Sequence, residues 1–196
     1  MTPDPCAAAD APARYLEALI TGADTRPVRV ASIYLPNGNP LGTEKFTYKI
    51  EWMKRLARRT RDLLAREEMF VLGGDYNVCP TDMDVYNPAA FADDALCQPQ
   101  SRQALRRLLN LGLTDAIRVF EPDTPQYTYW DYQGGAYQKD HGLRIDHLLL
   151  SPVLAPRLRA GGVDREVRGM EKASDHAPTW IALGPEPRRR RPAREG

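Results

Sequence analysis

The sequence predicts an α/β protein of the α+β type, in which sheets pack face to face and helices lie outside them. Segments with the alternating or wholly apolar pattern of strands outnumber segments with helical periodicity. Strand–helix–strand units are few, which favours sheet-on-sheet packing. The 17 prolines among 196 residues favour a fold rich in loops over a helical bundle. A chain of this length can bury one substantial core.

The first half of the chain is predicted to contain a strand and a long helix. Residues 1–13 are rich in Pro, Ala and Asp and are expected to be irregular. Residues 14–20 fit either a strand or a short helix, because their length does not decide between the two. Residues 28–35 alternate and are rich in β-branched side chains, which predicts a strand ending at the turn-forming segment 36–40. Apolar residues then recur at helical spacing over residues 46–65. The other face of this helix carries basic side chains that we interpret as solvent-facing, the alternative being that they attract phosphate: Lys49, Lys54, Arg55, Arg58, Arg59 and Arg61.

A short apolar strand over residues 69–72 is predicted to be buried on both faces and to end at Gly73 and Gly74. The long loop at 78–100 is of a length that is often functional. Ser101 is a plausible N-cap for the helix that follows it.

The second half is predicted to consist mainly of strands. The helix after Ser101 covers residues 103–111, and residues 113–120 fit no single pattern. We take residues 14–184 as one domain and the Arg-rich residues 185–196 as a disordered basic tail. The remaining strands are expected at 127–132, 143–150 and 180–183.

Composition limits the functional classes. The net charge of +1 gives no case by itself for a nucleic-acid partner. Three widely spaced cysteines, Cys6, Cys79 and Cys97, fit neither a disulfide framework nor a zinc site and favour a reducing compartment. No apolar run reaches the ~18 residues of a membrane helix, and the N-terminus lacks a signal-peptide pattern. We therefore expect a cytoplasmic protein with no membrane partner.

Three short polar groups stand where predicted strands begin or end. The first is Asp75-Tyr76-Asn77, in which alternation places the acid and the amide on one side. A carboxylate can orient or deprotonate water, and an amide can donate to a phosphoryl oxygen as charge develops. The alternative is a simple Asx turn after a strand.

The second and third groups are Asp146 and the pair Asp175-His176. Asp146 interrupts an apolar strand, where a charge needs a partner. If Asp146 lies beside His176, it would fix the imidazole tautomer and raise the histidine pKa. Without that contact, His176 is better explained as a buried histidine of the core. As neighbours in an extended segment, Asp175 and His176 would point to opposite sides, so that one could face a metal and the other a substrate.

Several other side chains could contact phosphate or DNA. Tyr34 ends a strand, where its phenol could donate to phosphate or simply cap the core. Trp130 lies in an aromatic segment that could stack on a base, although most of these rings should be core. Lys139 and Arg144 are candidate phosphate contacts on the same loop and strand start.

Taken together, these segments resemble the exonuclease III family of the endonuclease/exonuclease/phosphatase superfamily. The match runs from about Arg14 to Leu183. Five blocks occur in the family's order: Ile33–Gly38, Val71–Asp82, the aromatic loop, Gly142–His147 and Met170–Pro178.

The resemblance implies a DNase I-like four-layer α/β/β/α sandwich and a Mg²⁺-dependent (or Mn²⁺-dependent) DNA hydrolase. It would act as a monomer on double-stranded DNA, at 3′ ends and abasic sites. By residue, Asp75 would position or activate water, Asn77 would stabilise the pentacovalent phosphate, and Tyr34 would donate to phosphate or leaving group. His176, oriented by Asp146, would contact the phosphate. The metal would be held by Asp75, Asn77 and Asp175, and DNA contacts would come from Trp130, Lys139, Arg144 and His176.

The chain departs from the family at its beginning. Family members start with a strand ending in Trp-Asn, soon followed by a Gln-Glu whose glutamate binds the metal, and residues 1–13 offer neither. We therefore expect a domain that lacks its N-terminal part and has impaired activity. Two alternatives remain: a phosphoesterase of the same superfamily with a non-DNA substrate, and a DNA-binding remnant without catalysis.

Overall fold

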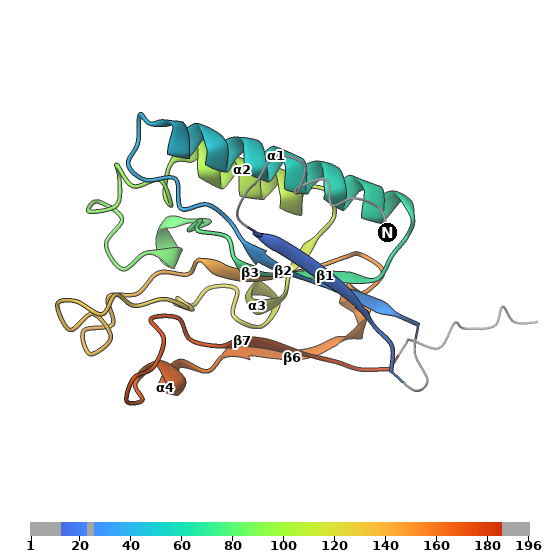
Figure 1. Cartoon of the computed structure of the whole chain (residues 1–196). Helices are drawn as coiled ribbons and strands as arrows, with labels where there is room; N and C mark the ends of the chain where they lie inside the picture. The colour runs from blue at the N-terminus through green and yellow to red at the C-terminus, as the bar shows by residue number, and fades with distance from the viewer. Residues whose placement is uncertain (1–12, 23–25, 186–196) are drawn as a thin grey trace, which may run out of the picture.

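The computed structural model describes residues 13–22 and 26–185. These form two sheets, and the two long helices pack on one side (Figure 1). The expected irregular segment 1–13 and basic tail 185–196 thus lie almost entirely outside the described residues, as does Cys6. Within the described ranges, no helix is long and apolar enough to cross a membrane.

The larger sheet has five strands in the order β1-β2-β3-β5-β4. β2 and β3 are parallel, and the other neighbours are antiparallel. The strands are β1 (Tyr15–Ile20), β2 (Val28–Tyr34), β3 (Phe70–Asp75), β4 (Thr114–Asp115) and β5 (Asp146–Leu150). The ambiguous residues 14–20 are therefore largely a strand, and the ambiguous residues 113–120 divide into β4 and a short helix.

The smaller sheet contains two antiparallel strands, and four helices complete the fold. The strands are β6 (Leu158–Val163) and β7 (Thr179–Leu183). The helices are α1 (Glu44–Ala65), α2 (Pro99–Leu109), α3 (Ala116–Phe120) and α4 (Arg165–Arg168).

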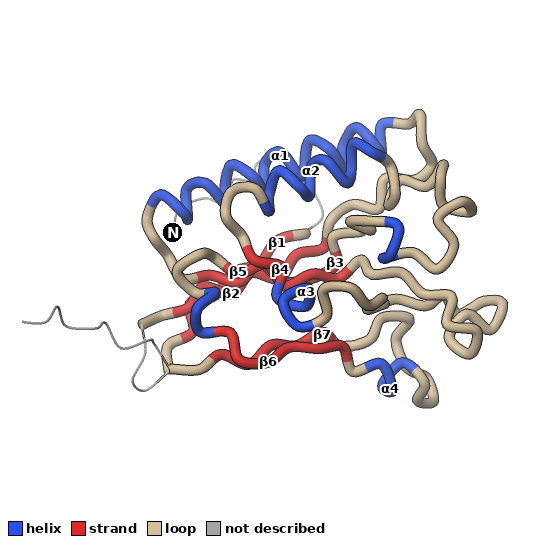
Figure 2. Tube along the Cα trace, turned by 180° about the vertical axis from the view of Figure 1, so that it is seen from behind, coloured by secondary structure: helices blue, strands red, loops and turns tan. Residues whose placement is uncertain are grey.

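The helices α1 and α2 cover one face of the large sheet, and β6 and β7 lie against the other (Figures 1 and 2). The main core is buried between α1, α2 and the sheet and includes Trp52, Leu56 and Leu72. A second cluster joins the two sheets through Val71, Leu150 and Ile181. This arrangement confirms the sandwich. In the described part of the chain, no helix layer covers the outer face of β6 and β7.

Helix α1 begins two residues before the predicted start, because the Thr43 hydroxyl accepts a hydrogen bond from the Lys45 amide and caps it. Its basic face is not wholly solvent-facing. Lys49 and Arg59 are buried, and Arg59 forms an ion pair with Glu17 of β1 at 2.5 Å. The prediction of a solvated basic face was wrong for these two side chains.

Helix α2 starts at Pro99 rather than after Ser101, because proline fits the first turn, where its missing N–H is no loss. Ser101 is a buried residue of that turn, and its hydroxyl donates to the Ala95 carbonyl at 2.7 Å. The N-cap is Gln98, so the capping role predicted for Ser101 was wrong.

Strand β3 continues through the two glycines that were expected to end it. Gly74 has φ of 137°, and an added Cβ would lie 2.1 Å from the Ile33 carbonyl oxygen. The glycine therefore allows β2 and β3 to stay paired up to the register partners Tyr34 and Asp75. β3 therefore continues through the two glycines and ends at Asp75.

The aromatic segment 127–132 is not a regular strand. Tyr129 alone forms isolated bridges, to Leu143 on one side and His176 on the other. Because Leu143 forms only isolated bridges, the regular strand β5 begins at Asp146 rather than at residue 143. Through Tyr129, the segment places His176 beside the residues that lead into the start of β5.

Candidate active site

The sheet register places three predicted site residues in a row. Tyr34 at the end of β2 is the register partner of Asp75 at the end of β3, and Asp75 is the partner of Asp146 at the start of β5. Partners on adjacent strands point to the same face, so the three side chains lie side by side at one end of the sheet. Each residue was predicted from the sequence to belong to the site, and the sheet register shows that the three are neighbours.

Asp75 and Asn77 are held together as the alternation predicted. Asp75 accepts hydrogen bonds from the Asn77 backbone N–H at 2.7 Å and from the Asn77 side-chain amide at 2.8 Å. Tyr76 points the other way into the core and donates to the Leu72 carbonyl at 3.0 Å. An Asx-type turn is therefore present, and it fixes the Asp75 carboxylate in place.

The Asn77 amide is fully engaged. Its nitrogen also donates to the Leu35 carbonyl at 2.9 Å, and its oxygen accepts from Asn37 at 3.1 Å. Both amide protons are thus used inside the protein. Asn77 can donate to a phosphate only by exchanging its bond to Asp75.

The contact between Asp146 and His176 is confirmed. The Nδ1 atom of His176 lies 2.8 Å from Asp146 Oδ2. Thr128 holds the start of β5, because its hydroxyl accepts from the backbone N–H groups of Ile145 and Asp146, both at 3.1 Å. With Nδ1 bound to the carboxylate, Nε2 of His176 remains for a substrate.

The two acid–base groups at this site have shifted pKa values. Burial, followed by the charge of Asp146, raises the pKa of Asp75 to about 7. For His176, burial acts to lower the pKa, but the hydrogen bond and charge of Asp146 and the charge of Asp75 outweigh it, so the pKa is raised. One group is thus poised as a base near neutral pH, while the other favours its cationic form.

A cavity of about 710 Å³ opens over this end of the sheet. Tyr34, Asp75, Asn77, His176 and the predicted phosphate contact Lys139 all line it. Tyr129 of the aromatic segment lines the cavity as well. Four further lining residues were given no role from the sequence: Tyr86, Phe91, Asp94 and His141. The rings of Tyr86 and His141 stack with their centroids 4.4 Å apart. Asp175 lies outside the lining.

Lys49 is the main functional neighbour that the sequence reasoning missed. It is buried, and its ammonium donates to the carbonyls of Asn77 at 2.6 Å and Asn37 at 2.9 Å. Burial lowers its pKa to about 8, against the charges of Asp94 and Asp75. A signal was present, because Lys49 lies three and four residues before Trp52 and Met53 on the buried stripe of α1.

A divalent cation fits this site only with few protein ligands and several bound waters. Among residues whose positions are described, no group of three or more His, Cys, Asp or Glu could hold a metal by itself. Asp75 and Asp146 nevertheless lie opposite each other in the sheet register, and after burial the charge of Asp146 is the second cause that raises the pKa of Asp75. Mg²⁺ keeps several waters and needs only one or two carboxylates. The predicted set of Asp75, Asn77 and Asp175 remains a prediction.

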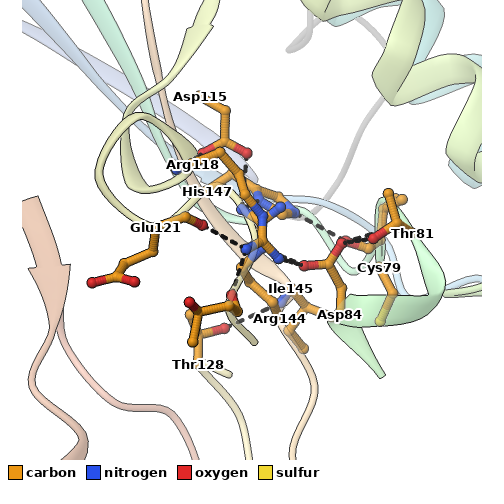
Figure 3. Close-up of polar contacts among 12 residues, drawn as sticks. Cys79, Thr81, Asp84, Asp115, Arg118, Glu121, Thr128, Arg144, Ile145 and His147 are labelled. Carbon is orange, nitrogen blue, oxygen red and sulfur yellow. Dashed lines mark hydrogen bonds and ion pairs between the residues drawn. The ribbon is translucent and has the colours of Figure 1, made fainter. Parts of the chain in front are cut away.

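Arg144 does not face the cavity, so its predicted contact with DNA phosphate is wrong for this structure. Its side chain is 1% exposed and forms ion pairs with Asp84 at 2.6 Å and Asp115 at 2.8 Å (Figure 3). Arg118 also pairs with Asp84. The burial of Arg144 is possible because two carboxylates compensate its charge.

His147, which is fully buried, completes this network. Arg144 donates to His147 Nδ1 at 3.2 Å, which leaves the proton on Nε2 to donate to the Val78 carbonyl at 2.9 Å. Burial and the charge of Arg144 lower the His147 pKa, so the ring stays neutral. Through the contacts of Arg144 with Asp84 and of His147 with Val78, the network ties the start of β5 to the loop after β3 (Figure 3).

Trp130 is also buried, with 1% of its surface exposed, so in this structure its ring is not available for the DNA contact that the resemblance implied. Its ring packs edge-on against Tyr127 and Tyr137, and its indole N–H donates to Asp140 at 3.1 Å. Tyr132 is the exposed aromatic residue of this segment, at 64%, whereas Tyr127 and Tyr129 are partly buried.

The fold and this site define a sandwich protein with an acid–base centre at the strand ends, the arrangement of a hydrolase. Comparison with known proteins agrees: the sequence profile of the Endonuclease/Exonuclease/phosphatase family matches residues 5–176. The chain therefore belongs to that family, and within it to the exonuclease III group.

Individual relatives support this assignment. An exodeoxyribonuclease of Bacillus subtilis is 32% identical over 157 residues, which cover 80% of this chain and 60% of the relative. A solved 3′-5′ exonuclease (NExo) of Neisseria meningitidis has 39% identity and a TM-score of 0.85, covering 92% of this chain and 68% of that one. An AP endonuclease of Archaeoglobus fulgidus has 32% identity and a TM-score of 0.80, covering 87% and 65%. The chain thus spans about 60% of the length of the curated relative from Bacillus.

Proposed function

We propose that this chain hydrolyses phosphodiester bonds of double-stranded DNA, at 3′ ends and beside abasic sites, with a divalent cation. The observation that carries the proposal is the row of Tyr34, Asp75 and Asp146 with His176 bound to Asp146. This row places a base, a phenol donor and a cationic imidazole around one cavity. These are the groups that water attack on a phosphodiester requires.

Each residue has a separate task. Asp75, with its pKa raised to about 7, takes the proton from the attacking water. His176 presents Nε2 to a phosphate oxygen, and Asp146 holds the ring and favours its charged form. Asn77 keeps the Asp75 carboxylate oriented and, when that bond exchanges, donates to the phosphate as charge builds. Tyr34, 58% exposed, donates to a phosphate or leaving-group oxygen.

The cation would be held by Asp75 with Asn77 and Asp175 nearby, and water would complete its coordination. When bound, it supplies positive charge that stabilises the developing charge on phosphate. Mg²⁺ suits such oxygen donors best, and Mn²⁺ is expected to substitute for it.

Two features support DNA as the substrate. The Bacillus relative is named an exodeoxyribonuclease, and the Archaeoglobus one an AP endonuclease. In this chain, exposed Lys139 lines the cavity and exposed Tyr132 lies on the same loop. A cation at the cavity wall suits a phosphate backbone, and an exposed ring suits an unstacked base.

Because the chain spans only part of its relatives' length, we propose that its activity alone is weak. Cleavage should therefore be measured with enzyme in excess over labelled duplexes. One duplex carries an abasic site, one a recessed 3′ end, and a third is an undamaged blunt duplex. Each is incubated with Mg²⁺, with Mn²⁺ and with EDTA, and the His176→Ala protein purified in the same way controls for contaminating nucleases.

We expect metal-dependent cleavage of the first two duplexes that EDTA and His176→Ala abolish. Retained duplex binding without any cleavage would overturn the proposal in favour of a DNA-binding remnant. Hydrolysis of a phosphoinositide, sphingomyelin or nucleotide but not of DNA would overturn it in favour of another phosphoesterase of the family.

A further inference from the structure

Two cysteines from opposite ends of the long loop at 78–100 lie against each other. Cys79 stands in the segment that leaves β3, and Cys97 stands just before the first residue of α2. Both are buried in one apolar cluster, which also contains Val85 and Leu143, and both are free thiols. The two thiols are hydrogen-bonded to each other. The ends of the loop therefore meet at a pair of thiols that has no part in the proposed hydrolysis.

The backbone holds the two cysteines in this position. The Cys79 N–H donates at 3.0 Å to the Leu96 carbonyl, which belongs to the peptide bond between Leu96 and Cys97. The Cys97 N–H donates to the Asp94 carbonyl, and Arg102 Nε donates to the Cys79 carbonyl, both at 3.1 Å. A disulfide requires cysteines with neighbouring backbones and side chains that point toward each other. Both conditions are met here.

The surroundings of the two thiols differ. Cys79 is completely buried, whereas 8% of Cys97 is exposed. The hydrogen bond from Cys79 lowers the pKa of the Cys97 thiol, and the charge of Arg102 in the first turn of α2 adds to this effect against that of burial. The reactive form of cysteine is the thiolate, and reactive cysteines lie in partly exposed, electropositive surroundings. Cys97 is therefore the better nucleophile of the pair.

We propose that Cys79 and Cys97 form a redox modification site, a dithiol that hydrogen peroxide oxidises to a reversible disulfide. The Cys97 thiolate attacks one peroxide oxygen, so that an S–O bond forms, the O–O bond breaks, and the second oxygen takes up a proton and leaves as water. The Cys79 sulfur then loses its proton and attacks the Cys97 sulfur, and the displaced hydroxide leaves as water. The two thiols lose two electrons, and one peroxide becomes two waters.

The disulfide lies beside the catalytic cavity. Leu96, which precedes one of the cysteines, lines that cavity, as do Leu143 and Ile145 of the cluster that surrounds the thiols. The bond ties this wall to the segment that leaves β3. In a reducing compartment it is transient, as most disulfides there are. Oxidation of the thiols requires neither DNA nor a cation, so a failure of the proposed nuclease function leaves this site unaffected.

The test uses the full chain with Cys6→Ser, in which Cys79 and Cys97 are the two remaining thiols. The reduced protein is treated with hydrogen peroxide, denatured and labelled with N-ethylmaleimide, and intact mass spectrometry counts the adducts. A second sample is returned to dithiothreitol before it is labelled. Chymotrypsin, which cleaves after Tyr86 and Phe91, places the two cysteines on different peptides, so that a disulfide appears as a linked pair.

Two further substitutions in the same background separate the roles of the thiols. Cys79→Ser removes the thiol that closes the disulfide, and dimedone then traps the sulfenic acid on Cys97. Cys97→Ser is the matched control, because it leaves only the completely buried Cys79. Circular dichroism verifies that both variants are folded. The chain with both thiols tests the disulfide by itself if either variant fails to fold.

We expect peroxide to abolish both maleimide adducts of the chain with two thiols, dithiothreitol to restore both, and the linked peptides to contain Cys79 and Cys97. Cys79→Ser should gain one dimedone adduct, and Cys97→Ser should keep its single thiol. The proposal would be overturned by two thiols that survive peroxide, by sulfinic acid on Cys97 without a disulfide, or by disulfides that form only between separate chains.

Discussion

At the scale of single residues, the site depends on pairs of side chains contributed by separate elements. Asp146 and His176 are 30 residues apart, and their contact at 2.8 Å gives the imidazole its orientation and its raised pKa. The sequence allowed this pair to be proposed, because a carboxylate inside an apolar strand needs a partner. The structure shows which partner it has.

Replacing Asp146 with Asn should lower the pKa of His176. The carboxylate charge and its hydrogen bond outweigh burial in the folded protein, and the amide supplies no such charge. NMR titration of the His176 ring measures the effect, and His147, which stays neutral, serves as an internal reference. Asp123→Asn, at an exposed position, should leave the His176 pKa unchanged. An unaltered titration in Asp146→Asn would refute the assigned role.

Arg144 shows why a residue near the site can be misjudged from sequence. It stands two positions before Asp146, but its partners Asp84 and Asp115 are 60 and 29 residues away. Nothing local distinguishes an arginine that faces phosphate from one that compensates buried carboxylates. Lys49 was misjudged for the same reason, since its acceptors are carbonyls of distant loops.

Arg144→Met should reduce the free energy of unfolding by about 3–5 kcal/mol, because it leaves Asp84 and Asp115 buried without their shared partner. Urea denaturation followed by circular dichroism measures this change. The control is Lys54→Met, which removes an exposed ion pair with Glu51 and should change the free energy of unfolding far less, because solvent screens exposed charges. Equal effects of the two substitutions would show that the buried network does not stabilise the fold.

At the scale of elements, segments with a strong local pattern were predictable and those fixed by distant pairing were not. α1 and β2 show the periodicity and alternation that their burial requires, and the structure places both within a few residues of the prediction. The aromatic segment 127–132 also has a strand-like composition, but only Tyr129 of its residues forms β-bridges, and these are isolated. β6 was not anticipated, because Gly161 and Gly162 interrupt its pattern.

Gly74 of β3 allows the close approach of β2 and β3 that positions Asp75. Gly74→Ala places a Cβ 2.1 Å from the backbone oxygen of Ile33, so β3 must separate from β2 just before Asp75. We expect a loss of roughly 1–3 kcal/mol in the free energy of unfolding.

Gly73→Ala is the control, since its Cβ would meet only the end of the Leu148 side chain at 2.8 Å, which can move. Chemical denaturation compares the two variants. If Gly73→Ala proves the more damaging, the close approach of β2 and β3 does not govern this end of the sheet.

At the scale of the whole molecule, the sandwich could be predicted because the number and order of apolar segments require two sheets to share a core. The width of the second sheet could not be predicted. Within the described ranges, this sheet has two strands and the larger one has five. The catalytic cavity opens at the larger sheet, where β2 ends at Tyr34 and β3 ends at Asp75.

The proposal that the row of Tyr34, Asp75 and Asp146 cuts DNA is tested most directly by the single-turnover cleavage rate of an abasic duplex with the wild-type chain and with Asp75→Asn. We expect Mg²⁺-dependent cleavage that falls by roughly 10²–10⁴-fold in the variant, because the base at the centre of the row is lost. Asp82→Asn, at a carboxylate whose side chain is 72% exposed, should retain the wild-type rate. Equal rates for wild type and Asp75→Asn, or cleavage that persists in EDTA, would show that this row does not carry out the hydrolysis.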